Sequence, residues 1–192
     1  MQQSNRKWPI YSTCIEDQTG VMKTFGEIAF TPAVQTLQER DGSRAAYARI
    51  AERGAPEGLG PDEAEFLGRA DSFYLATVGE TGWPYVQHRG GPRGFLKVVS
   101  PTRITFPDFR GNRQYVSVGN VANDDRASMI VMDYVNRRRL KLLGRLRFHD
   151  AGGERVATFD VEAFDWNCPQ HITPRYTQAE WEARDVRRQR GL

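Results

Sequence analysis

From Ser72 onward the chain is a succession of short segments rich in β-branched and aromatic residues, separated by turn residues at hairpin spacing. Such segments favour antiparallel neighbours, because parallel strands need a long crossover between them. The pattern predicts a mainly β fold with flanking helices, built on a closed or partly closed antiparallel barrel of six or so strands. The expected strand segments are 73–78, 83–89, 95–99, 103–109, 126–134, 139–148 and 156–165.

Helical signals flank these segments. Thr31-Pro32 supplies an N-cap and a first-turn proline for a helix towards Ile50, and Asp41-Gly42-Ser43 interrupts it, so one helix and two shorter helices fit the pattern equally. Gly60-Pro61 opens another helix through about Ala70. A further helix or helical turn is expected over 112–121, and a capping box of Thr177 and Glu180 begins a terminal helix through about Arg190.

These elements divide the chain into three parts. We expect residues 1–70 to form an arm and helices packed on the barrel, with Phe25, Ile28 and Phe30 as anchors. Residues 71–176 would form the barrel itself, and residues 177–192 a C-terminal helix.

The composition is that of an ordinary globular protein, with 39% hydrophobic and 27% charged residues. The 27 basic residues barely exceed the 24 acidic ones, and this small excess does not by itself indicate a nucleic-acid-binding protein. The two cysteines, Cys14 and Cys168, form neither a disulfide framework nor a CxxC motif. No secretory signal precedes the fold and no apolar run approaches the roughly 20 residues of a membrane helix. We expect a soluble, cytoplasmic protein.

Common catalytic and nucleotide-binding signatures are missing from the sequence, including GxGxxG, the P-loop, HExxH and GxSxG. The three histidines, His88, His149 and His171, do not have metal-ligand spacing. No metal is therefore expected.

Two polar segments differ from the rest of the expected barrel. Gln87-His88-Arg89-Gly90-Gly91-Pro92-Arg93-Gly94 places polar side chains at a strand end, followed by glycines that let a backbone approach a ligand. Asp108-Phe109-Arg110-Gly111-Asn112-Arg113-Gln114 joins a strand to an expected helix. Free backbone N–H groups and arginine side chains at such a junction suit a phosphate. The alternative is two arginine-containing turns that face solvent.

These segments resemble the pyridoxamine 5′-phosphate oxidase-like proteins, a group of FMN-binding split barrels, and in particular an uncharacterised bacterial branch of it. The resemblance covers roughly residues 72 to 176. It rests on Trp83-Pro84-Tyr85-Val86-Gln87-His88-Arg89-Gly90-Gly91-Pro92, Asp108-Phe109-Arg110-Gly111-Asn112-Arg113-Gln114-Tyr115, Arg138-Arg139-Leu140-Lys141-Leu142-Leu143-Gly144-Arg145 and Asp165-Trp166-Asn167-Cys168-Pro169-Gln170-His171-Ile172-Thr173-Pro174-Arg175.

The resemblance implies a six-stranded antiparallel split barrel that forms a homodimer with FMN at the subunit interface. It implies that one strand lies along the flavin and that a strand end and the following helix hold the phosphate. A later strand would add a polar contact at Arg139, where many relatives have glutamine. Trp166 would close the pocket from the other subunit. The implied cofactor-binding residues are Val86, Gln87, His88, Arg89, Gly90, Asp108, Phe109, Arg110, Asn112, Arg113, Gln114, Arg139 and Trp166.

Three functions fit this sequence. The first is an FMN-dependent oxidoreductase with a small-molecule substrate, in which the flavin carries the redox chemistry and no protein acid or base is assigned. The second is a flavin-binding carrier or sensor without turnover. The third is a barrel that binds phosphate or nucleic acid through basic and aromatic side chains.

The substrate is not expected to be pyridoxamine 5′-phosphate. The true oxidases carry an arginine two residues before a C-terminal histidine, and here residue 169 before His171 is a proline. Pro174 also removes a backbone donor and restricts the loop. His171 and Arg175 either orient a different substrate or pin the tail across the partner subunit.

Overall fold

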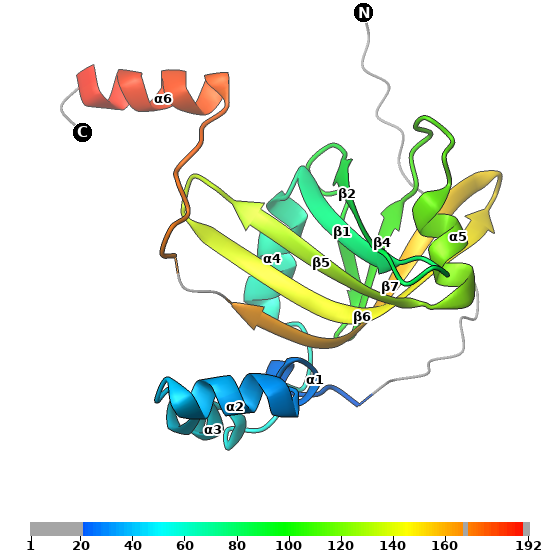
Figure 1. The fold of residues 1–192 in the computed structure, drawn as a ribbon. Coiled ribbons are helices and arrows are strands. Elements are labelled where there is room, and N and C mark those ends of the chain that lie inside the picture. Colours follow the sequence, from blue (N-terminus) through cyan, green and yellow to red (C-terminus); the bar gives the residue numbers. More distant parts are fainter. Residues whose placement is uncertain (1–20, 167–168, 190–192) are drawn as a thin grey trace, which may run out of the picture.

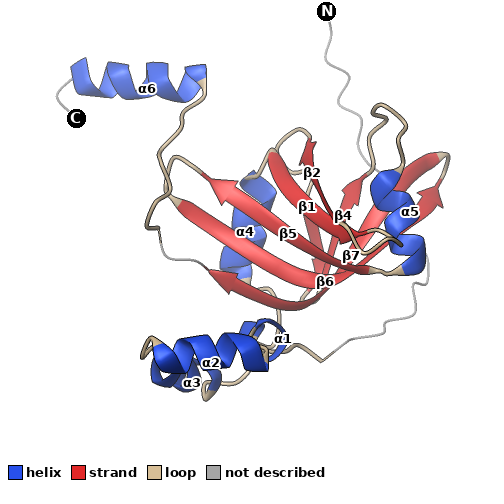
Figure 2. Ribbon diagram, in the orientation of Figure 1, coloured by secondary structure: helices blue, strands red, loops and turns tan. Residues whose placement is uncertain are grey.

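The computed structural model describes residues 21–166 and 169–189, and Figures 1 and 2 show their helices and strands. The helices are α1 Phe25–Ala29, α2 Pro32–Arg40, α3 Arg44–Ala51, α4 Pro61–Arg69, α5 Val116–Asn123 and α6 Gln178–Gln189. The strands are β1 Ser72–Val78, β2 Pro84–Gly90, β3 Lys97–Ser100, β4 Arg103–Pro107, β5 Arg126–Asp133, β6 Arg138–Ala151 and β7 Glu154–Trp166.

The seven strands of the described chain form one antiparallel sheet in the order β2-β1-β5-β6-β7-β4-β3. The expected mainly β fold is confirmed, and each of the seven segments expected from the sequence forms a strand. The six strands that the resemblance implies are one too few, because the sheet also includes the short edge strand β3 beside β4. The sheet is also not closed, because no ladder joins β2 to β3 in the described residues. Since β3 has only four residues, it offers β2 little edge to pair with.

The sheet bends within the antiparallel pairing of β6 with β7. The pairing register shifts between Leu143 and Gly144, which marks a bulge that bends the strand and increases its twist. A Cβ on Gly144 would lie 2.0 Å from the carbonyl oxygen of Asp160 and 2.9 Å from the ring of Phe159. The two strands therefore approach more closely than any residue with a side chain permits. Figure 1 shows the long strands β6 and β7 curving across the molecule.

Alternate residues of the strands supply the core. Phe73, Leu75, Phe106 and Phe159 are almost completely buried, as are the inward leucines of β6. Burying side chains of this size stabilises a fold by about 1.5–3 kcal/mol each. The helix α4 covers one end of the core with Phe66 and Leu67, so its amphipathic face is used for packing.

Most helices begin and end at their predicted signals, and α5 is the exception. The helix after Thr31-Pro32 is two helices, α2 and α3, because Gly42 adopts a φ of 75° between them. The helix expected over 112–121 begins only at Val116, since Arg113 and Tyr115 have left-handed φ values of 61° and 55°. None of the helices among the described residues is both long and apolar enough to span a membrane.

The described part of the N-terminal arm contacts the sheet at β7. Residues 1–20 and Cys168 lie outside the described residues. In the described part of the arm the buried anchor is Met22, and the backbone N–H of Lys23 donates to the carbonyl of Glu162 at 2.8 Å. The expected anchors Phe25, Ile28 and Phe30 are only half-buried, because the short helix α1 carries them along the surface.

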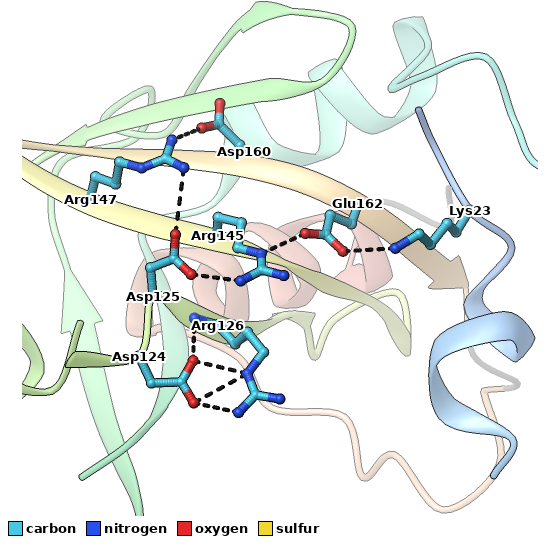
Figure 3. Close-up of polar contacts among 8 residues, drawn as sticks. All are labelled: Lys23, Asp124, Asp125, Arg126, Arg145, Arg147, Asp160 and Glu162. Atoms are coloured by element: carbon cyan, nitrogen blue, oxygen red, sulfur yellow. Dashed lines mark hydrogen bonds and ion pairs between the residues drawn. The ribbon is translucent and has the colours of Figure 1, made fainter. Parts of the chain in front are cut away.

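A chain of ion pairs crosses the outer surface of β6, β7 and β4, most of it visible in Figure 3. Arg145 donates to Asp125 and Glu162, each at 2.7 Å, and these hydrogen bonds raise its pKa above the ordinary range. Arg147 continues the chain from Asp125 to Asp160, and Arg103 donates to Asp160 at 2.6 Å. The network links three strands on the outside of the bend.

Gly144→Ala is expected to destabilise the protein by about 3 kcal/mol, because the new methyl group meets a backbone carbonyl that cannot rotate away. Gly68→Ala is the matched control. Gly68 lies within α4 and a Cβ there meets nothing within 4 Å, so this change should stabilise the helix by about 0.5–1 kcal/mol. Urea unfolding of both variants measures the two effects, and an unchanged midpoint for Gly144→Ala would contradict the close approach.

Candidate functional site

The two polar segments identified in the sequence line one groove of about 80 Å³. One wall is the face of β2 that carries Tyr85, Gln87 and Arg89, and the other is the loop 108–115 between β4 and α5. The structure thus brings together Gln87 and Arg89 with Asp108, Phe109, Arg110, Asn112, Arg113 and Gln114. The first turn of α5 and the start of β7 complete the lining with Val116, Ser117, Val118 and Arg155.

Strand alternation divides the predicted residues of β2 between two faces. Gln87 and Arg89 lie opposite Leu75 and Phe73 of β1, which point into the core. Val86 and His88 therefore point to the outer face, where Val86 is 63% exposed. The cofactor-binding residues expected on β2 are therefore divided between the groove and the outer face of the strand.

Asp108 holds the centre of the groove through two guanidinium groups. Its side chain is only 6% exposed, and one carboxylate oxygen accepts from Arg89 Nη1. The other oxygen accepts from Arg155 Nε at 2.5 Å, and the backbone N–H of Asp108 donates to the carbonyl of Arg155 at 2.8 Å. The hydrogen bond to Asp108 raises the pKa of Arg155. The Nε of Arg89 is buried and has no partner among the described residues.

The loop before α5 is shaped by side-chain and backbone hydrogen bonds. The side-chain oxygen of Asn112 accepts from the backbone N–H of Gln114 at 3.2 Å, a turn that asparagine favours. Arg113 sits inside this turn with a left-handed φ and an exposed side chain. The hydroxyl of Ser117 donates to the side-chain oxygen of Gln87 at 2.9 Å, which ties the first turn of α5 to β2.

Arg110 and Arg113 are the free cations of the groove. Both are exposed, and within residues 21–166 and 169–189 neither forms an ion pair with a carboxylate. Their planar multi-donor groups suit a phosphate, and they flank the buried pair of Arg89 and Arg155. The donor set of the groove is therefore cationic, with Asp108 as its one carboxylate among the lining residues.

The outer-face residues form a second group. The ring of His88 meets that of Tyr74 edge-on at 5.6 Å, and Tyr74 hydrogen-bonds Tyr134. Burial first and this hydrogen bond second raise the pKa of Tyr134. The guanidinium of Arg175 lies 4.8 Å from the centre of the Tyr134 ring. The predicted residues His88 and Arg175 are thus linked through two tyrosines, away from the groove.

Arg139 and Trp166 also lie outside the groove of the same chain. Arg139 pairs with Met132 across β5 and β6, and its buried Nε has no partner in the described part of the chain. Trp166 ends β7, where its indole N–H donates to Glu63 at 2.6 Å and its ring packs on Phe66. In this chain Trp166 anchors α4 to the sheet.

The tail residues border a larger cavity of about 780 Å³ between α4, the turn that joins β5 to β6, and the start of α6. Arg175 lines it together with Arg69, Arg93 and Arg138. His171 is exposed, has a left-handed φ of 62° and is not part of its lining. No cluster of His, Cys, Asp and Glu in the described residues has the arrangement of a metal site.

Sequence reasoning assigned no role to several residues of the groove, among them Arg155, Ser117 and Tyr115. Arg155 is 47 positions from Asp108 and follows a Gly-Gly turn, so no local pattern connects it to the site. Ser117 and Tyr115 could have been predicted as site residues, because they continue the strand-to-helix junction that the sequence already indicated. The hydrogen-bonding side chain of Ser117 one turn after Arg113 was the available signal.

The profile of the pyridoxamine 5′-phosphate oxidase family matches residues 59–180. This range is well over half of the chain, and the protein belongs to that family. None of the curated proteins compared with the chain matches it.

Several solved structures are similar to the chain at low identity. HupZ of Group A Streptococcus is 10% identical with a TM-score of 0.47, over 62% of this chain and 99% of its own. A Clostridium acetobutylicum protein related to general stress protein 26 of B. subtilis is 13% identical with a TM-score of 0.42, over 58% of this chain and 88% of its own. An F420 reductase is 19% identical with a TM-score of 0.41, over 58% and 98%.

Asp108→Asn is expected to destabilise the protein by about 3 kcal/mol, because it leaves the largely buried guanidinium of Arg89 and the partly exposed one of Arg155 without their counter-charge. The exposed Asp41, which pairs with Arg40 at 3.1 Å, is the matched control, and Asp41→Asn should cost less than about 1 kcal/mol. Urea unfolding at neutral pH measures both. Equal losses of stability in the two variants would show that the charge of Asp108 contributes no more to stability than that of the exposed Asp41.

Proposed function

We propose that the protein binds FMN and works as a flavin-dependent oxidoreductase. The observation that carries the proposal is the groove itself: two free guanidinium groups, Arg110 and Arg113, beside the pair that Asp108 holds. This donor set fits a phosphate group, and the buried unpartnered Nε of Arg89 adds to the unsatisfied donors nearby. Flavin binding is a property of the family to which the chain belongs.

The side chains of the groove are suited to holding a cofactor. Asp108 is occupied by two arginines, so it is not free to act as a base. Ser117 is bonded to Gln87. A bound flavin supplies hydride or electron transfer, while the protein binds and orients it. A single cationic groove of this size matches the one phosphate of FMN better than the pyrophosphate of FAD.

The proposed substrate is a small molecule other than pyridoxamine 5′-phosphate. The tail offers Arg175 on the large cavity, but Pro169 stands where the true oxidases have an arginine and His171 faces solvent. A pocket that lacks a charged partner for its substrate discriminates against that substrate strongly.

The division of the predicted residues between two faces supports a homodimer. Gln87 and Arg89 line the groove, whereas Val86, His88 and the Tyr74–Tyr134–Arg175 group lie on the outer face. A two-fold related copy would place the outer face of one subunit against the groove of the other, with FMN between them.

FMN is expected in the purified protein, and Arg113→Ala should lower its affinity about tenfold to a hundredfold, since a charge-assisted hydrogen bond contributes about 1.5–3 kcal/mol. Heat release and chromatography identify the flavin, and fluorescence titration gives the dissociation constant. Arg40→Ala on α2, remote from the groove, is the control and should bind as the wild type does. A dominant FAD peak, or unchanged affinity in Arg113→Ala, would count against the proposal.

The protein is expected to be a dimer at low micromolar concentration, because the outer face of β1 and β2 exposes Val86, Tyr74 and Val78. Val86→Glu should shift the mass measured by light scattering towards the monomer, since it places a charge in the interface. Ile50→Glu on α3, also at an exposed apolar position, should leave the mass unchanged. A wild-type monomer that retains FMN would sink the dimer proposal.

A further inference from the structure

Two arginines of the large cavity are held in place by aromatic rings and not by carboxylates. The guanidinium carbon of Arg138 lies 4.4 Å from the centre of the Trp166 ring and 5.3 Å from that of the Phe66 ring. The guanidinium carbon of Arg175 lies 4.8 Å from the centre of the Tyr134 ring. A guanidinium that stacks on a ring keeps its N–H donors, which lie in its own plane, available for an anion.

The rings that support these two arginines are themselves fixed. The indole N–H of Trp166 donates to Glu63 at 2.6 Å, and Tyr134 shares a hydrogen bond with Tyr74. Arg138 begins β6, whereas Arg175 lies in the tail that leads to α6 (Figure 1). The fold therefore brings two positioned cations from distant parts of the sequence to the border of one cavity.

The carboxylates that line the cavity are engaged elsewhere, with one exception. The engaged ones are Glu65, which pairs with Arg69 at 2.6 Å, Glu180, which pairs with Arg93 at 3.3 Å, Asp133, which accepts from Asn136 at 2.7 Å, and Asp71, which accepts from the hydroxyl of Ser72 at 3.0 Å. The exception, Asp62, is exposed in the first turn of α4, where a negative charge suits the helix N-terminus. Within residues 21–166 and 169–189, Arg138 and Arg175 form no ion pair with any of them.

We propose that the large cavity binds a small organic acid with two carboxylate groups, one held by Arg138 and the other by Arg175. Guanidinium and carboxylate groups are planar and pair through two parallel hydrogen bonds. Phe66, Met132 and Val135 also line the cavity and offer apolar contacts to the carbon skeleton between the carboxylates. The volume of about 780 Å³ lies in the range of small-molecule sites. The cavity shares no lining residue with the groove, so this site is separate from the one proposed for FMN.

The test compares acids with neutral ligands of nearly the same shape. Malonate, succinate, glutarate and adipate are the probes, and the corresponding diamides are the controls. Calorimetric titration of the purified full-length protein should show binding of at least one of these acids and no binding of its diamide. The titration needs no flavin, because the two arginines and their supporting rings make no use of the groove.

Arg138→Gln and Arg175→Gln should each weaken binding of that acid about tenfold to a hundredfold, since each removes a charge-assisted pair. Arg126→Gln is the matched control. It removes an exposed arginine that pairs with Asp124 outside the cavity, and it should bind the acid as the wild type does. Unchanged affinity in both cavity variants, or an equal loss in Arg126→Gln, would overturn the assignment.

A measurement on the wild-type protein separates binding from folding, because Arg138→Gln also removes the contacts with Trp166 and Phe66. The side-chain NMR signals of Arg138 and Arg175 should shift with the acid and not with the diamide, and that of Arg126 should not shift. Failure of all four acids to bind, equal binding of acid and diamide, or unshifted signals of the two cavity arginines would each overturn the site. A protein that binds an acid but takes up no FMN would support the site and overturn the proposed function alone.

Discussion

The close approach of β6 and β7 at Gly144 determines where the groove forms. In the sheet order, β2 and β4 are five steps apart, which would separate them by about 24 Å in a flat sheet. Yet Arg89 of β2 bonds Asp108 directly after β4. This contact requires the sheet to curl, and the bulge at Gly144 lies in the middle of the path between the two strands. A side chain at this position would push β7 away, and with it the paired β4 and its loop.

The gap in the sheet is therefore also the location of the candidate site. Where a closed barrel would join β2 to β3 by backbone hydrogen bonds, this protein places side chains, with Asp108 linking β2, the loop after β4 and the start of β7. Charged side chains at an edge also discourage edge-to-edge association. The same arrangement leaves guanidinium groups lining the opening, so the incomplete closure of the sheet and its cationic groove have one structural origin.

Much of the fold was predictable because it depends on local patterns. Alternating apolar residues located all seven strands, and Gly42 and the Thr177–Glu180 capping box marked helix ends that the structure confirms. The strand count of the barrel and its closure depend on pairing between distant segments, which no local pattern reveals. The groove likewise combines features that local sequence indicates with features that depend on distant segments. Loop 108–114 and the end of β2 were each identified as polar segments, but the burial of Asp108 and the contribution of Arg155 depend on how the sheet curls.

The two faces of β2 connect the groove to the tail. On the inner face Arg89 is bonded to Asp108, and on the outer face His88 packs on Tyr74, which reaches Arg175 through Tyr134. Because β2 is an edge strand paired only with β1, side-chain contacts on both faces help to hold it in position. A displacement of the tail would therefore act on the same strand that carries Arg89 into the groove. The groove and the residues that border the large cavity are in this way connected through one strand.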